Sequence, residues 1–110
     1  MYDIFDTSTK TIKPGQAHEN TLSGMKAVYV DVRTPEEYAA GHIPGAVNIE
    51  VSRIREAKKT LPDTGATYYV YCQSGIRSAR ACAVMQDMGY ENVYDMGAIT
   101  EWEWEYEIEK

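Results

Sequence analysis

Apolar positions in this chain gather in short runs, separated by turns and by longer segments of helical composition. The runs are nearly all apolar or aromatic, which is typical of strands buried on both faces. We expect buried strands at 27–30, 46–49, 67–71 and 93–94, and an edge strand at 11–12. We expect helices over 15–22, 35–40, 52–60 and 78–88. Strands that alternate with helices in this way predict an α/β domain with a mostly parallel sheet.

Residues with strong positional preferences mark the ends of these helices. Pro14 suits the first turn of the first helix, and Gly24 follows its end. Thr34 can cap the second helix, and Gly41 closes it. Two glutamates in the first turn of the second helix face the positive end of its dipole, which favours acidic side chains. Gly89 is expected to stop the last helix.

The length of 110 residues suits one domain with its own hydrophobic core. We assign residues 10–102 to this domain, 1–9 to a polar lead-in and 103–110 to an acidic aromatic tail. Near the tail, Trp102, Trp104, Tyr106 and Ile108 alternate with glutamates, which indicates an extended segment with one apolar face. Ile99, Trp102 and Tyr106 also fit a helix. The apolar face either packs on its own domain or pairs with another subunit or domain.

The formal net charge of −6 argues against binding to nucleic acid or to anionic membranes, both of which need a basic surface. A small anionic substrate is not excluded, because its binding depends on the local field of a site. No apolar run approaches the ~20 residues of a membrane span, and the first ten residues do not resemble a secretory signal. We therefore expect a cytoplasmic location.

Residues 72–78, with the sequence Cys-Gln-Ser-Gly-Ile-Arg-Ser, hold the main candidate chemistry. Cys72 ends a predicted strand and lies in a short loop that opens a helix. Backbone N–H groups and the positive end of a helix dipole stabilise anions at such a place, so the thiol is expected to ionise and act as a nucleophile. Gly75 can take the left-handed backbone angles of a tight loop. Arg77 adds a permanent cation.

Two long motifs in the correct order resemble those of the single-domain rhodaneses, a thiosulfate sulfurtransferase-like family. The first is the loop pattern Cys-x-x-Gly-x-Arg-Ser, and the second is VDVRTPEEYAAGHIPGAVNI at 30–49. A third, weaker match is 97–99 followed by Trp102, where Ala98 replaces the second of two glycines usual in the family. The resemblance spans roughly 10–102 and implies a three-layer domain, with helices flanking a mostly parallel central sheet.

The residues and the resemblance both indicate sulfur transfer through a persulfide on Cys72. The thiolate attacks the outer sulfur of a donor such as thiosulfate, sulfite leaves, and a thiol or cyanide acceptor removes the outer sulfur. We expect Asp31 and Arg33 to form an ion pair that supports the loop. No metal or other cofactor is required. We assign substrate-binding roles to Arg77, Gln73, Ser74, Gly75, Ile76 and Ser78.

Two further functions remain open. Cysteine-dependent phosphatases and arsenate reductases place five residues between cysteine and arginine, whereas four residues separate Cys72 from Arg77. The smaller loop favours a sulfur atom over a tetrahedral phosphate or arsenate. Gln73 is neutral where many thiosulfate-type loops carry a basic residue. This difference and the acidic tail favour a sulfur-relay or binding module, in which Cys72 accepts a persulfide from a protein partner.

Cys82 and His42 are secondary candidates. Cys82 could resolve an oxidised Cys72, but its apolar neighbours favour a small core residue. One reactive thiol and one structural thiol fit a reducing compartment. His42 could act as a general base, yet the proposed chemistry needs none once the thiol is ionised. We therefore interpret His42 as a residue that orders the turn at 41–45.

Overall fold

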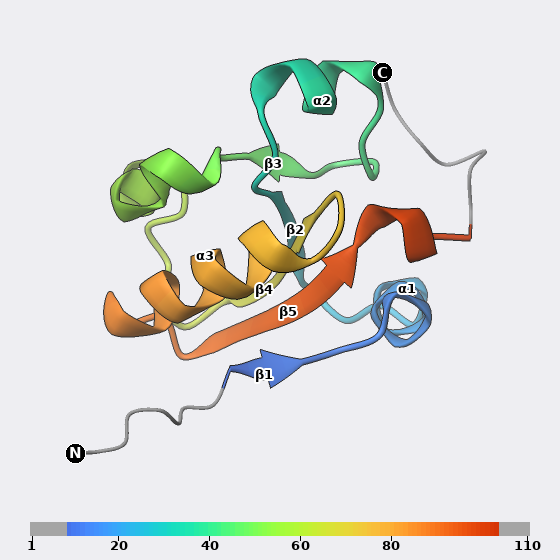
Figure 1. Cartoon of the computed structure of the whole chain (residues 1–110). Coiled ribbons are helices and arrows are strands. Elements are labelled where there is room, and N and C mark those ends of the chain that lie inside the picture. The colour runs from blue at the N-terminus through green and yellow to red at the C-terminus, as the bar shows by residue number, and fades with distance from the viewer. Residues whose placement is uncertain (1–8, 104–110) are drawn as a thin grey trace.

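Within residues 9–103, which the computed structural model describes, five parallel strands form one sheet in the order β1-β5-β4-β2-β3 (Figure 1). The predicted α/β class is confirmed. β4 lies in the middle of the sheet, so its carboxyl end is enclosed by neighbouring elements. The strands are β1 (Lys10–Thr11), β2 (Val28–Asp31), β3 (Val47–Asn48), β4 (Thr67–Cys72) and β5 (Asn92–Ala98).

Helices connect the strands and cover both faces of the sheet (Figure 1). Pro14 begins the first α-helix and Thr34 caps the second, as the sequence predicts. The cap is a reciprocal capping box, in which Thr34 and Glu37 each accept a hydrogen bond from the other's backbone N–H. The α-helices are α1 (Pro14–Leu22), α2 (Pro35–Ala40) and α3 (Ile76–Asp87), and the 3₁₀ helices are η2 (Val51–Lys59) and η3 (Ile99–Glu101).

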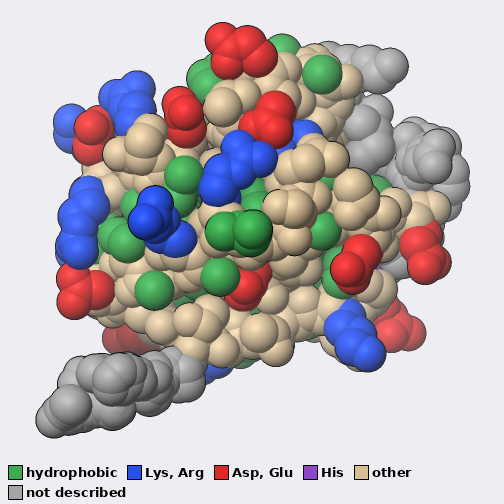
Figure 2. Space-filling model, viewed as in Figure 1, with side chains coloured by type: hydrophobic (Ala, Val, Ile, Leu, Met, Phe, Trp, Pro, Cys, Tyr) green, Lys and Arg blue, Asp and Glu red, His purple; other side chains and the backbone are tan. Residues whose placement is uncertain are grey.

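The helix expected at 52–60 is a 3₁₀ helix, η2, that begins one residue earlier. Its buried side chains, Ile54 and Ala57, are three residues apart. A 3₁₀ helix aligns positions i and i+3, so this spacing places both side chains against the sheet. The lysines and arginines of η2 are exposed, and Figure 2 shows basic side chains gathered on this side of the molecule.

Two other elements differ from expectation near the reactive loop. α3 begins at Ile76, two residues earlier than predicted, because Gly75 takes a left-handed conformation at its start. β5 extends to Ala98, well beyond the predicted 93–94. It follows β4 along its whole length, and a shift in register accommodates Met96 as an extra residue.

The two faces of the sheet bury separate apolar clusters, as a three-layer domain requires. Side chains alternate along β4, so Val70 and Cys72 face α3 and η2, whereas Tyr69 and Tyr71 face α1. Cys72 is therefore held within the core on the α3 side. This placement fixes the sulfur at the carboxyl edge of the sheet, where ligands of α/β proteins usually bind.

Trp102 closes the second cluster. Its ring makes edge contacts with His18 at 5.0 Å and with Tyr29 at 5.8 Å, and the residue is buried. Packing on its own domain is thus confirmed for this residue. The rest of the alternating pattern, Trp104, Tyr106 and Ile108, lies outside the described residues. Among residues 9–103, no helix is long and apolar enough to cross a membrane.

Candidate active site

The sulfur of Cys72 lies where β4 ends and the chain turns into α3. Cys72 is fully buried, and its Sγ accepts hydrogen bonds from the backbone N–H groups of Gly75, at 2.9 Å, and Ser78, at 3.3 Å. Donors aimed at a sulfur stabilise its anionic form, because hydrogen bonds to a charged group favour that charge. The loop therefore has the anion-stabilising arrangement that the sequence predicts.

Gly75 makes this loop possible through its backbone. Its φ of +102° and ψ of −13° lie in a region that side chains disfavour. A Cβ added at this position would lie 3.8 Å from the Cα of Gly97, which is an ordinary contact. Any penalty for a side chain at position 75 therefore comes from backbone strain and not from a clash.

Gly75→Ala is expected to lower the free energy of unfolding by about 1–2 kcal/mol, the usual penalty for a left-handed residue with a Cβ. Gly15→Ala is the matched control, because this helical glycine has open space around its Cα. The control should raise stability by about 0.5–1 kcal/mol. Urea denaturation measures both changes, and equal effects of the two substitutions would contradict the strain argument.

The backbone N–H of Ser78 donates a hydrogen bond to the sulfur of Cys72, and its hydroxyl supports the loop through two further hydrogen-bond contacts. The Oγ lies 3.0 Å from the carbonyl oxygen of Gly75 and 2.7 Å from Oδ1 of Asp95, two acceptors between which its proton can be shared. Oδ1 of Asp95 also accepts a hydrogen bond of 2.9 Å from the N–H of Gly97. Asp95 therefore fastens the first turn of α3 to β5, a role that the sequence pattern did not indicate.

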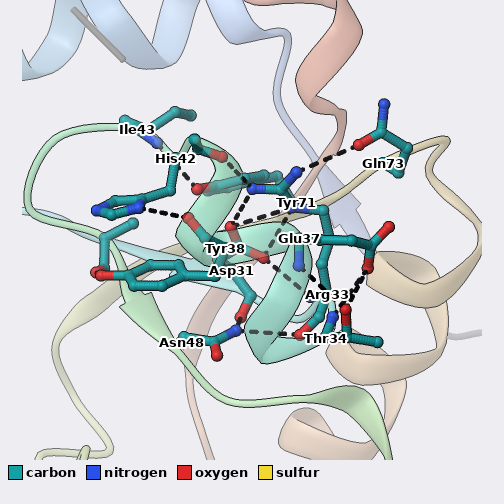
Figure 3. Close-up of polar contacts among 12 residues, drawn as sticks. Asp31, Arg33, Thr34, Glu37, Tyr38, His42, Ile43, Asn48, Tyr71 and Gln73 are labelled. Atoms are coloured by element: carbon teal, nitrogen blue, oxygen red, sulfur yellow. Dashed lines mark hydrogen bonds and ion pairs between the residues drawn. The ribbon is translucent and has the colours of Figure 1, made fainter. Parts of the chain in front are cut away.

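Asp31 and Arg33 form a buried ion pair beneath the loop (Figure 3). Arg33 Nη2 lies 2.7 Å from Asp31 Oδ2, and its Nε lies 3.1 Å from both carboxylate oxygens. The exposed fractions of the two side chains are 0% for Asp31 and 5% for Arg33. Burial alone would lower the pKa of Arg33, but the hydrogen bond and the charge of Asp31 raise it above its ordinary value. The ion pair expected from the sequence is therefore present.

Arg33 also joins the pair to the reactive loop (Figure 3). Its Nη1 donates to Oε1 of Gln73 at 3.2 Å, and its Nη2 donates to the carbonyl oxygen of Gly41 at 2.7 Å. One guanidinium thus links β2, the end of α2 and the loop after Cys72. Asn48 adds two hydrogen bonds from its Nδ2, to the carbonyl oxygens of Asp31 and Arg33. The support that this network gives to catalysis remains a prediction.

Arg77 lies in the first turn of α3 and forms an ion pair with Glu37 of α2. Its Nη1 and Nη2 lie 2.7 Å and 3.1 Å from the two carboxylate oxygens. The hydrogen bond from Arg77 is the main cause that lowers the pKa of Glu37 to about 2. The sequence indicates the cation, whereas the pairing joins residues 40 positions apart and carries no local signal.

The remaining loop residues are exposed to solvent. Gln73 and Ser74 are both exposed, and Gln73 accepts the hydrogen bond from Arg33 described above. Ile76 is 79% exposed, so its side chain points away from the core that surrounds the sulfur. The substrate-binding roles assigned to these residues remain predictions.

Cys82 and His42 each make contacts typical of a residue that supports the fold. Cys82 is a free, fully buried thiol in the core cluster that contains Cys72, and burial is the main cause that raises its pKa. His42 stacks on the ring of Tyr38 at 3.6 Å, and its Nδ1 lies 2.8 Å from the carbonyl oxygen of Tyr38. Both arrangements agree with the structural interpretations drawn from the sequence. Among residues 9–103, no group of three or more His, Cys, Asp or Glu side chains is arranged to hold a metal ion.

Known proteins resemble this chain in both sequence and fold. The family model for the rhodanese-like domain matches residues 15–105. The chain belongs to the family of rhodanese-like domains. It is 38% identical over 72 residues to the thiosulfate sulfurtransferase PspE of Escherichia coli, covering 64% of this chain and 69% of that protein. The structure of the human single-domain sulfurtransferase TSTD1 superposes with a TM-score of 0.72 at 30% identity, covering 86% of this chain and 96% of that one.

Rhodanese-like domains also occur within longer proteins. This chain is 37% identical over 95 residues to the probable adenylyltransferase/sulfurtransferase MoeZ of Mycobacterium tuberculosis. The match covers 84% of this chain but 24% of MoeZ. These relatives support a sulfurtransferase-type activity, and they connect the fold both with single-domain enzymes and with multidomain sulfurtransferases.

Proposed function

We propose that the protein transfers sulfane sulfur from a small anionic donor to a thiol or cyanide acceptor through a persulfide on Cys72. The observation that carries this proposal is the pair of N–H groups, from Gly75 and Ser78, directed at Sγ. They stabilise a thiolate, and they would also stabilise the anionic persulfide that replaces it. Membership of the rhodanese-like family supports sulfur chemistry over phosphatase chemistry at this loop.

The proposed cycle has two halves. In the first, the Cys72 thiolate attacks the outer sulfur of thiosulfate, an S–S bond forms, and the donor's S–S bond breaks. Sulfite leaves with the bonding electron pair and a persulfide remains on Cys72. In the second half, cyanide or a thiolate attacks the outer sulfur and the Cys72 thiolate is regenerated. The cycle needs no metal or cofactor, since each step exchanges one nucleophile for another.

Initial-rate kinetics test this two-step scheme. Because sulfite leaves before the acceptor reacts, double-reciprocal plots at several cyanide concentrations should give parallel lines with thiosulfate as the varied substrate. Sulfite should also form in a single turnover without any acceptor. Intersecting lines, together with sulfite release that depends strictly on cyanide, would indicate direct transfer and contradict a persulfide intermediate.

A sulfur-relay function is the second candidate, and the polar contacts of the loop favour it. Gln73 is neutral and Arg77 is already paired with Glu37, so the loop is less suited to small anions than two unpaired cations would make it. The match to a multidomain adenylyltransferase/sulfurtransferase is consistent with this function. Transfer from a protein-bound persulfide that is faster than transfer from thiosulfate would favour the relay. The reverse order would favour the small-donor enzyme.

We also propose that the protein works in the cytoplasm. Both cysteines are free thiols in the structure, and one of them ends the central strand beside two N–H donors. A nucleophilic thiol survives best in a reducing compartment, where disulfides are rare.

A further inference from the structure

The carboxylate of Glu37 forms an ion pair with Arg77, the cation of the reactive loop. Both of its oxygens contact Arg77, at 2.7 Å and 3.1 Å, in a bidentate arrangement. Such fork-shaped pairs have the geometry with which arginine binds other planar or multivalent anions. An anionic donor that approached Arg77 would therefore meet a guanidinium that already has an anion bound.

Glu37 is held in this position by more than Arg77. Its Oε1 also accepts hydrogen bonds from the backbone N–H of Thr34, at 2.9 Å, and from the hydroxyl of Thr34, at 3.2 Å. The capping box of α2 thus fixes the carboxylate of Glu37 beside the first turn of α3, where Arg77 lies. The pKa of Glu37 is about 2, so the group is ionised at neutral pH. The negative charge beside the loop is therefore permanent.

The exposure of the pair allows this contact to be exchanged. The side chains of Arg77 and Glu37 are 32% and 33% exposed, so solvent and small ions can reach them. Ion pairs at such partly exposed positions are weak and are screened by salt. A donor anion can therefore compete with Glu37 for Arg77, but it must overcome both the existing pair and repulsion from the carboxylate.

We propose that Glu37 is a specificity-determining residue, an internal counter-ion that competes for Arg77 and disfavours donors with high negative charge. This inference rests on the proposed sulfurtransferase function and names the donor class that the site prefers. Donors that carry a single negative charge, or whose leaving group is a thiol, should react more readily than the thiosulfate dianion. Electrostatic repulsion grows with the product of the charges, so the discrimination should follow donor charge.

Two donors with the same reacting bond isolate the effect of charge. Thiosulfate is a dianion and releases sulfite, whereas methanethiosulfonate is a monoanion and releases methanesulfinate. In both reactions the Cys72 thiolate takes the outer sulfur, the S–S bond to the sulfonyl group breaks, and the leaving group departs with the electron pair. The two reactions therefore differ mainly in the charge that is brought beside Glu37.

The variant Glu37→Gln removes the charge and keeps the helix cap, because glutamine also serves as the third residue of a capping box. We expect kcat/KM to rise about tenfold for thiosulfate and about threefold for methanethiosulfonate, since a Coulombic effect on a dianion has twice the logarithm of that on a monoanion. Glu36→Gln is the matched control. It makes the same charge change at the exposed neighbouring position and should alter neither rate by more than about twofold.

A binding measurement separates this inference from the proposed function. In the unreactive Cys72→Ser background, adding Glu37→Gln should tighten thiosulfate binding about tenfold in calorimetry. Unchanged affinity, or equal rate increases for both donors, would overturn the role of Glu37 even if sulfur transfer is intact. If wild-type protein transferred no sulfur from either donor, the proposed function would fail, and the change in affinity would still decide whether Glu37 competes for Arg77.

Discussion

Cys72→Ser is expected to lower kcat/KM for sulfur transfer by at least about 10³-fold, because the serine hydroxyl neither ionises at neutral pH nor carries a sulfane sulfur. The loop itself should persist. The serine oxygen can accept the hydrogen bonds that Gly75 and Ser78 now donate to Sγ. Loss of activity would therefore report on the nucleophile and not on a collapsed site. Thiocyanate formation from thiosulfate and cyanide measures the rate.

The second cysteine supplies the control for this substitution. Cys82 belongs to the same buried cluster as Cys72, but it lies in α3 and its thiol has a pKa raised chiefly by burial. Cys82→Ala should keep most of the turnover, although it leaves a small cavity in the core. If Cys82→Ala abolished transfer as fully as Cys72→Ser, Cys82 would have to take part in the chemistry.

Arg33→Met is expected to lower the free energy of unfolding by about 3–5 kcal/mol, because it leaves the fully buried carboxylate of Asp31 without its cation. The same change removes the hydrogen bonds of Arg33 to Gln73 and Gly41, so the loop should also lose support. Urea denaturation measures the change in stability. Arg53→Met is the control, because Arg53 is an exposed arginine of η2, and it should leave the unfolding midpoint unchanged.

The double variant Asp31→Leu/Arg33→Met tests the physical cause of that loss. When both charges are absent, no unpaired ion remains in the core, so the double variant should be more stable than Arg33→Met alone. If the double variant were as unstable as the sum of the two single variants, the loss would come from packing. The explanation based on a buried, unpaired charge would then be wrong.

The parts of this site that the sequence predicts depend on local signals. The run that ends at Cys72 is apolar and aromatic, and Gly75 follows three residues later, so the strand and its tight loop could be predicted. The sequence predicts Thr34 as the helix cap, and the spacing from Thr34 to Glu37 is that of a capping box. The two motifs also occur in the family's order along the chain, and this resemblance predicts the arrangement of the strands and helices. The structure confirms the α/β fold.

The parts that the sequence does not predict depend on contacts between distant residues. Glu37 meets Arg77, and Arg33 meets Gln73, across 40 positions in each case. The contact between Asp95 and Ser78 requires β5 to continue along β4 as far as Asp95, whereas the predicted strand stops at residue 94. Neither hydrophobic periodicity nor residue type indicates which charged side chains will meet across two elements.

The most direct test of the proposed chemistry is the mass of the Cys72 peptide after the protein has reacted with thiosulfate and the donor has been removed. We predict a gain of about 32 Da, one sulfur atom, on the peptide that contains Cys72. The gain should disappear when cyanide is added and should be absent in Cys72→Ser. No added mass with thiosulfate, methanethiosulfonate or a protein-bound persulfide, or a gain on Cys82 instead, would contradict the assignment of Cys72 as the sulfur carrier.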